Sequence, residues 1–267
     1  MVLMSKSFNR HLWDVRVPAR DGVSLSVDIY LPEEEGCYPT VLLATPYDNT
    51  MKTEVDMAEF FARNGYAYVQ MDVRGRYDSG GDWVPMMNEG PDEYDVIEWV
   101  SQQPWSNGKV GMMGGSYRGW VQWAAAKLKP PHLITMVPTA TGGDYMREYP
   151  FYNGIPTLWI LGWLNFVGGR TCQNNASSTI NWEKVFRSLP VKDMPKLLGR
   201  EMPIWEEWMS HPDLDDYWNR IIFKPKDFHN IDMPILHITG WYDGDQPGAL
   251  HYYNEMLKHS PAADGNS

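Results

Sequence analysis

A serine in a glycine-rich segment is the residue of this 267-residue chain that most clearly could do chemistry. Ser116 lies in Gly114-Gly115-Ser116-Tyr117-Arg118-Gly119, after a short apolar run and before a helical pattern. A serine on a sharp strand-to-helix turn is the exposed nucleophile of acyl-transfer hydrolases, and adjacent glycines relieve the crowding of its backbone. The alternative is a glycine-rich helix start with Ser116 as its N-cap. The flanking strand and helix favour the nucleophile.

The residue after the serine could stabilise negative charge that develops during the reaction. Tyr117 opens the predicted helix, so its backbone N–H has no partner within the helix and lies at the positive end of the helix dipole. We expect this N–H to stabilise the oxyanion of a tetrahedral intermediate. One such donor contributes roughly 3–4 kcal/mol in the transition state.

The elements around Ser116 alternate between strands and helices. Such alternation predicts an α/β protein with a mostly parallel sheet and helices on both faces, and the serine turn predicts the α/β-hydrolase fold. Thr53 is the predicted N-cap of the first helix. The predicted strands are residues 23–31, 40–44, 66–73, 109–113, 133–137 and 233–239, and the predicted helices are residues 55–64, 91–102, 117–128 and 247–258.

The alternation stops between residues 141 and 226, where the sequence predicts no strand. Six of the 13 tryptophans fall in this stretch. Because aromatic rings bury large apolar areas, we interpret it as a helical, Trp-rich cap over a site; the alternative is a helical subdomain without substrate contact. We therefore divide the chain into an α/β-hydrolase core, residues 1–140 and 227–267, and a cap insertion, residues 141–226.

Composition excludes several function classes. The formal net charge of −11 disfavours binding to nucleic acid or to anionic membranes. The first ten residues lack the apolar core of a signal peptide, and no apolar stretch is long enough to span a membrane. The two cysteines, Cys37 and Cys172, lack metal-ligand spacing and indicate free thiols in the cytoplasm. We expect a cytoplasmic protein that uses no metal or cofactor; its oligomeric state is not indicated.

Eight short segments, in order from about residue 14 to 255, resemble the family of cocaine esterase, X-Pro dipeptidyl-peptidases and α-amino-acid ester hydrolases. In this family the glycine after the nucleophile comes one residue later than usual, as Gly119 does here. The matching segments are Arg20-Asp21-Gly22 leading into Asp28-Ile29-Tyr30-Leu31-Pro32, Thr45-Pro46-Tyr47-Asp48, Asp72-Val73-Arg74-Gly75-Arg76, Glu98-Trp99 with Gln103-Pro104-Trp105, Asn107-Gly108-Lys109-Val110-Gly111, Gly114-x-Ser116-Tyr117-x-Gly119, His211-Pro212 with Asp215-Asp216-Tyr217-Trp218, and Gly240-Trp241-Tyr242-Asp243.

The resemblance implies a serine hydrolase that cleaves small-molecule esters or amides, with esterase or dipeptidyl-peptidase activity. It implies that Ser116 is the nucleophile and Asp243 the acid of the catalytic triad. It also implies that the Tyr47 hydroxyl joins the Tyr117 N–H in the oxyanion hole. Both Tyr47 and Asp243 follow predicted strands, at the sheet edge where open α/β sheets place their sites. From spacing alone, a core or turn tyrosine is the favoured interpretation of Tyr47.

None of these segments supplies the histidine that acts as the general base of a catalytic triad. In this fold the order is serine, then acid, then histidine. Only His251 and His259 follow Asp243, and both fall in a predicted helix, whereas His237 alternates with apolar residues as a core histidine would. In the family, the base and a β-sandwich domain come after the point that corresponds to Ser267. We therefore assign no catalytic histidine and expect a fragment or a truncated product.

The sequence is compatible with two functions. One is a serine hydrolase acting through an acyl-enzyme. The other is a catalytically impaired ligand-binding or scaffold domain that keeps the pocket without its base. A peptidase or amino-ester hydrolase must also hold an ammonium group. Acidic cap residues could do so or could simply be a solvated face: Glu206, Glu207, Asp213, Asp215 and Asp216.

Overall fold

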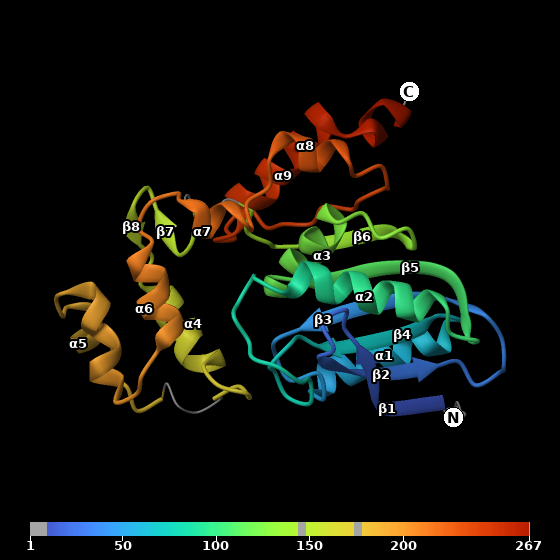
Figure 1. Cartoon of the computed structure of the whole chain (residues 1–267), viewed down its shortest axis with the longest axis horizontal. Coiled ribbons are helices and arrows are strands. Elements are labelled where there is room, and N and C mark those ends of the chain that lie inside the picture. Colours follow the sequence, from blue (N-terminus) through green and yellow to red (C-terminus); the bar gives the residue numbers. More distant parts are fainter. Residues whose placement is uncertain (1–9, 144–147, 174–177, 267) are drawn as a thin grey trace, which may run out of the picture.

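The computed structural model describes residues 10–143, 148–173 and 178–266 (Figure 1). Its main feature is a six-stranded sheet with the strand order β1-β2-β4-β3-β5-β6. The first two pairings, β1 with β2 and β2 with β4, are antiparallel, and the other three are parallel. The strands are β1 (Arg10–Pro18), β2 (Ser24–Leu31), β3 (Tyr38–Thr45), β4 (Ala67–Asp72), β5 (Ser106–Gly115) and β6 (Leu133–Thr139).

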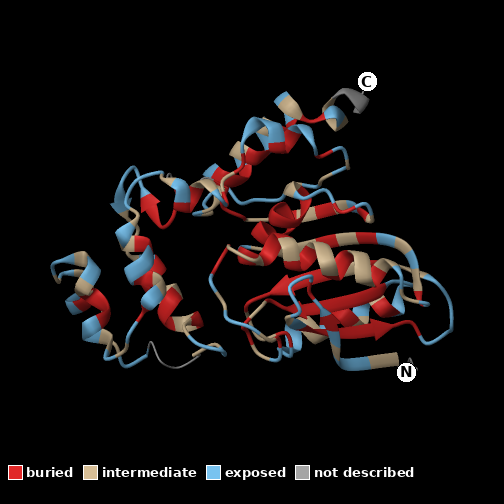
Figure 2. Cartoon of the chain, viewed as in Figure 1, coloured by how far each residue is buried: buried red, intermediate tan, exposed pale blue. Residues whose placement is uncertain are grey.

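Helices cover both faces of this sheet, which confirms the predicted fold class. Successive side chains of a strand point to opposite faces. Leu42 and Val69 therefore join the main core with α2 (Glu89–Ser101) and α3 (Tyr117–Lys127), whereas Leu43 and Tyr68 belong to a second cluster with α1 (Lys52–Arg63). Because central strands are covered on both sides, they are almost uniformly buried and read as continuous apolar runs (Figure 2).

The start of α1 differs from the prediction. Thr53 is not the N-cap; Met51 occupies that position and makes no side-chain cap hydrogen bond. The preceding turn is held by Asp48, whose carboxylate accepts hydrogen bonds from the Thr50 N–H (2.8 Å) and hydroxyl. This turn delivers the chain into the helix at Lys52, so Thr53 already lies inside the first turn.

The strand predicted at residues 233–239 is present only as two isolated parallel bridges to β6, Met136 with Ile235 and Thr139 with Ile238. The Leu236 N–H donates to the Met136 carbonyl (3.1 Å) and the Ile238 N–H to the Pro138 carbonyl (3.2 Å). Pro138 has no N–H to return, so the ladder is interrupted between the bridges. Regular helix resumes at α9 (Gln246–His259), close to its predicted bounds.

The stretch after β6 contains a small hairpin, so the expectation of no strand there was wrong. Its two-residue strands are β7 (Phe151–Tyr152) and β8 (Ile155–Pro156), joined by Asn153-Gly154. Both turn residues have positive φ, 49° and 81°, as a type I′ turn requires, and Asn-Gly is the sequence signal for it. The remaining elements are α4 (Trp159–Val167), α5 (Trp182–Phe186), η1 (Val191–Leu198), α6 (Pro203–Ser210), α7 (Asp216–Asn219), α8 (Pro225–His229) and, after α9, η2 (Pro261–Asn266).

Three tryptophans between residues 141 and 226 are part of the main hydrophobic core. Trp205, Trp208 and Trp218 are at most 1% exposed, so their role is packing. Figure 1 shows α4, α5 and α6 as a group beside the sheet. The boundaries at residues 141 and 226 stay a prediction. Among the residues that the structure describes, no helix is long and apolar enough to cross a membrane.

A buried acid on α2 gives a test of this core. Glu93 is completely buried, and neither carboxylate oxygen has a hydrogen-bond partner. Burial, then the neighbouring acids Glu89 and Asp92, raise the pKa of Glu93 well above its usual value. A carboxyl whose pKa is raised on folding lowers stability as the pH rises above the unfolded-state pKa, by up to about 1.4 kcal/mol per pH unit.

We therefore expect Glu93→Gln to remove the loss of stability that the buried Glu93 carboxyl causes as the pH rises. The free energy of unfolding of the variant, measured by urea denaturation from pH 5 to 8, should rise progressively relative to the parent protein. Glu35→Gln, in an exposed turn, is the control and should show no pH-dependent difference. A constant difference between Glu93→Gln and the parent across this range would contradict the assignment of a neutral Glu93.

Candidate active site

The backbone of Ser116 is strained. The residue links β5 to α3 with φ 59° and ψ −128°, a conformation that non-glycine residues rarely adopt and that costs about 1–3 kcal/mol. The Ser116 N–H donates to the carbonyls of Thr139 (2.9 Å) and Ala140 (3.1 Å), which anchors the turn to the end of β6. Such a turn places the serine side chain at the carboxyl edge of the sheet, as the sequence predicts.

Two glycines make room for this turn. At Gly114, with φ 147°, an added Cβ would lie 2.6 Å from the Cβ of Arg118. At Gly119 it would lie 2.8 Å from the Cβ of Thr141. Both distances are too short for a side chain, so glycine is required at each position. The second glycine falls at 119 because the end of β6 packs against that point of α3.

Tyr47 and Tyr117 line the same cavity as Ser116. Tyr47 follows β3 and accepts a hydrogen bond from the indole N–H of Trp163 on α4 (3.1 Å). Burial raises the pKa of Tyr47, and hydrogen bonds with Trp163 and Ser116 partly offset this rise. Tyr47 is therefore a neutral phenol. Since Trp163 fills an acceptor site on its oxygen, the Tyr47 O–H remains available as a donor into the cavity.

The side chain of Tyr117 is fixed from behind. Its hydroxyl donates to the carboxylate of Glu89 and accepts from the Met86 N–H (2.9 Å). Burial raises the pKa of both Tyr117 and Glu89. The Trp163 ring stacks on the Tyr117 ring at 5.9 Å between centroids. These contacts hold the first residue of α3, and with it the N–H predicted for the oxyanion hole.

Asp243 lies near the serine turn but does not line its cavity. The Ala140 N–H donates to the Ile238 carbonyl (2.7 Å), which brings the segment before Asp243 beside the turn. The Asp243 carboxylate accepts from the Thr239 hydroxyl (3.3 Å) and from the Asp245 N–H (3.2 Å). The acidic residue among those that line the cavity is Asp245, which no sequence pattern singled out.

None of the seven histidines, all of which lie in the described residues, lines the cavity or hydrogen-bonds to Ser116. His132 pairs with Glu98 (2.8 Å), and His211 pairs with Asp215 (2.5 Å). His237, expected in the core, is half-buried between the rings of Trp123 and Tyr253. Burial lowers its pKa to about 4. The structure thus gives Ser116 no histidine base from this chain.

A buried arginine connects the core to α4. Arg76 is fully buried, and its guanidinium donates to the carbonyls of Pro46 (2.8 Å), Val167 (2.5 Å) and Gly169. Pro46 directly precedes Tyr47, and Val167 ends the helix that carries Trp163. One side chain therefore holds both partners of the Tyr47–Trp163 hydrogen bond in register. Arg76 belongs to the segment Asp72-Val73-Arg74-Gly75-Arg76, one of those that carry the family resemblance, but the sequence did not predict its structural role.

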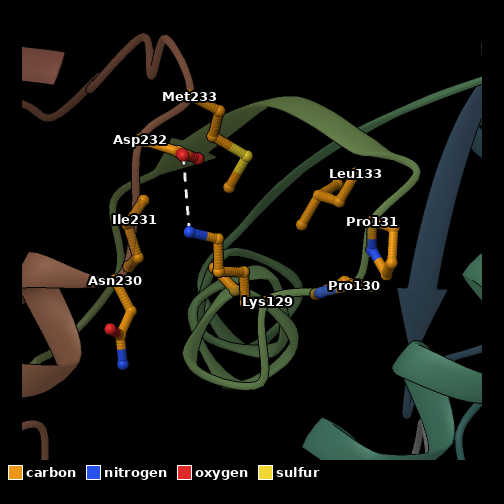
Figure 3. A pocket seen from close by; sticks show the side chains of 9 residues that line it. Lys129, Pro130, Pro131, Leu133, Asn230, Ile231, Asp232 and Met233 are labelled. Carbon is orange, nitrogen blue, oxygen red and sulfur yellow. Dashed lines mark hydrogen bonds and ion pairs between the residues drawn. The ribbon is translucent and has the colours of Figure 1, made fainter. Parts of the chain in front are cut away.

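The cavity at Ser116 encloses about 320 Å³ including its open mouth. A larger cavity of about 710 Å³ lies elsewhere, between the end of α3 and the segment before residue 233 (Figure 3). It is spanned by the ion pair of Lys129 with Asp232 (3.4 Å) and includes Leu133, the first residue of β6. Because Ser116 bonds to the other end of β6, about 20 Å along the strand, this cavity is separate from the site.

Comparison with known proteins shows to which family this chain belongs. A sequence profile of the X-Pro dipeptidyl-peptidase (S15) family matches residues 21–263. The chain belongs to this family. It is 32% identical over 253 residues to cocaine esterase from Rhodococcus sp. (strain MB1 Bresler), an alignment that covers 86% of this chain and 44% of that protein. The resemblance stated from the sequence is thereby confirmed.

Solved structures agree with the family assignment. The chain is similar to an α-amino acid ester hydrolase, with 26% identity and a TM-score of 0.77 over 97% of this chain and 47% of the other. An aminopeptidase from a marine sediment archaeon (Thaumarchaeota archaeon) shares the fold, with 24% identity and a TM-score of 0.79 over the same shares. The chain thus spans less than half the length of these S15-family relatives.

The role of Arg76 can be tested by stability. Arg76→Met keeps an unbranched side chain but leaves the three carbonyl acceptors without their donor. We expect the free energy of unfolding to fall by about 2–5 kcal/mol, because each buried unpaired polar group costs about 1–3 kcal/mol. Arg187→Met, at an exposed position on the cap, is the matched control. Equal stability of the two variants in thermal denaturation would refute this function of Arg76.

Proposed function

We propose that this chain carries the nucleophile, the oxyanion hole and the acid of a serine hydrolase that cleaves acyl esters or amides. The observation that carries the proposal is the strained Ser116 backbone at the end of β5, in one cavity with Tyr47 and Tyr117. Family membership supports it, since the name of one relative is that of an esterase and that of another an ester hydrolase.

The reaction would follow the acyl-enzyme route. The Ser116 hydroxyl oxygen attacks the substrate carbonyl, and its proton passes to a base. The carbonyl oxygen becomes an oxyanion that accepts hydrogen bonds from the Tyr47 O–H and the Tyr117 N–H. Collapse of this intermediate expels the alcohol or amine, which takes the proton, and leaves the acyl group on Ser116. Water then hydrolyses the acyl-enzyme by the same steps.

The proton acceptor is assigned outside residues 1–267. No histidine of this chain lines the cavity, and loss of a base lowers catalysis by several orders of magnitude. We assign to Asp243 the role of orienting that base, in keeping with its place in a loop beside the serine turn. The alternative is a binding or scaffold domain that retains the cavity but performs no hydrolysis.

The two functions differ in the reactivity of Ser116. In the complete gene product, we expect a fluorophosphonate probe to label Ser116 covalently, as peptide mass spectrometry would detect, and Ser116→Ala to abolish labelling. Hydrolysis rates for an aryl ester and for an X-Pro arylamide would then separate an esterase from a dipeptidyl-peptidase. A folded gene product that retains Ser116 but resists the probe would establish the scaffold alternative.

The oxyanion hole makes a quantitative prediction. Tyr47→Phe keeps the ring but removes the hydroxyl, so kcat for an aryl ester should fall roughly 10²- to 10³-fold, while KM changes little. Tyr242→Phe removes a hydroxyl from a side chain that is 96% exposed and should leave both constants unchanged. A change in KM alone for Tyr47→Phe would mean that Tyr47 binds substrate without stabilising the oxyanion.

A further inference from the structure

A groove runs along α3, outside the cavity that contains Ser116. Its volume is about 660 Å³ including its open mouth. One wall is the helix face that carries residues 120, 124, 127 and 128, whose spacing places them side by side. The start of α2 and the residues after α7 form the other walls. We call this the α3 groove, and its apolar side chains include Met86, Met87, Trp120, Ala124, Leu128 and Ile221.

The floor of the α3 groove is held from several sides. Met86 and Trp120 are only 4% and 2% exposed. The Met86 N–H donates to the Tyr117 hydroxyl (2.9 Å), and the Trp120 ring lies 5.9 Å from the Tyr117 ring, centroid to centroid. Beside them, a Cβ added to Gly90 of α2 would lie 2.8 Å from the Ala124 carbonyl oxygen, so the two helices are in close contact. The groove is thus preformed, which lowers the cost of ordering it around a ligand.

The two charged side chains that line the groove are both positive. They are Lys127 and Arg220, and among the described residues no acidic side chain lines the groove, although the chain has a net charge of −11. The Lys127 ammonium donates to the carbonyl of Ile222 (2.9 Å), two residues beyond Arg220, so both cations lie at the same end of the groove. Asp227, at 3.6 Å, balances part of the charge of Lys127. The groove therefore joins an apolar length to a positive end.

Arg220 is positioned by its neighbours and still has donors to offer. Its Nε donates to the Tyr217 carbonyl (3.2 Å), and its guanidinium lies over the Tyr217 ring, 4.7 Å from the centroid. Within the described parts of the chain, no carboxylate pairs with Arg220, and its two terminal NH₂ groups have no hydrogen-bond partner. A guanidinium fixed in this way presents a fork of N–H groups that matches a carboxylate.

The dimensions of the groove limit the class of ligand. From residue 120 to residue 127 the wall extends about 10 Å along the helix axis. An apolar body of that length would contact Trp120 and would cover Leu128, which is 42% exposed, and removing this surface from water is favourable. A small inorganic anion would leave these walls unused, and a cation would be repelled by the positive end.

We propose that the α3 groove binds an organic carboxylate with an extended apolar body, and that Arg220 binds the carboxylate group. This site is distinct from the cavity that contains Ser116, although Met86 lines both. The proposal goes beyond the function proposed above and does not depend on it, because binding requires no hydrolysis. Acids of this class are also what a hydrolase releases from apolar acyl esters.

The test is calorimetric titration of the complete gene product with octanoate and with 1-octanol, which has the same number of carbons but no charge. We expect octanoate to bind roughly 10- to 100-fold more tightly, because the alcohol cannot make the charge-assisted hydrogen bonds. Arg220→Gln should weaken octanoate binding by a similar factor and leave 1-octanol binding unchanged. Arg220 is exposed, so this variant should fold as the parent does.

Two further variants locate the ligand. Arg187→Gln, which removes an exposed arginine that does not line the groove, is the matched control and should leave both affinities unchanged. Leu128→Ala shortens an exposed apolar wall and should weaken both ligands severalfold.

Three results would overturn the proposal. The first is equal affinity for octanoate and 1-octanol, or no octanoate binding at all. The second is octanoate binding that Arg220→Gln does not weaken, or weakens no more than Arg187→Gln does. The third is unchanged binding of both ligands in Leu128→Ala, since the apolar body would then lie outside the α3 groove.

Discussion

The backbone of Ser116 is the constraint on which the rest of the site depends. Its left-handed conformation persists because Gly114 and Gly119 leave space on either side and because the end of β6 accepts its N–H. The parallel pairing of β5 with β6 is thus a condition for the turn as well as a part of the core. Any change that separates these strands would relax the serine.

Helix α4 also contributes to the geometry of the site. Trp163 hydrogen-bonds Tyr47 and stacks on Tyr117, so a helix after β6 orients two residues that follow β3 and β5. Arg76 fastens that helix by backbone carbonyls, without a carboxylate partner among the described residues. Packing and buried hydrogen bonds are short-ranged and directional, which is why these contacts fix geometry more tightly than a surface ion pair would.

The acidic residues around the Ser116 cavity differ in their hydrogen-bond partners. Behind Tyr117, the buried carboxylate of Glu89 accepts hydrogen bonds from the Tyr117 hydroxyl and from the Met86 N–H (3.2 Å), and burial raises its pKa. In front, Asp245 lines the cavity without a countercharge within the described chain.

The sequence by itself determined the fold class, the serine turn and the family, because these depend on local patterns: apolar periodicity, glycines at fixed offsets from Ser116, and short segments in order. The predicted N-cap at Thr53 was wrong, and the hairpin at Asn153-Gly154 was not predicted; turn chemistry decided both. The strand predicted at residues 233–239 forms only two isolated bridges, because a proline in the neighbouring strand interrupts the ladder. Only the tertiary structure distinguished Asp245 from Asp243 and connected Arg76 and Trp163 to Tyr47. These contacts join residues far apart in the chain, and local pattern carries no information about which side chains a fold brings into one cavity.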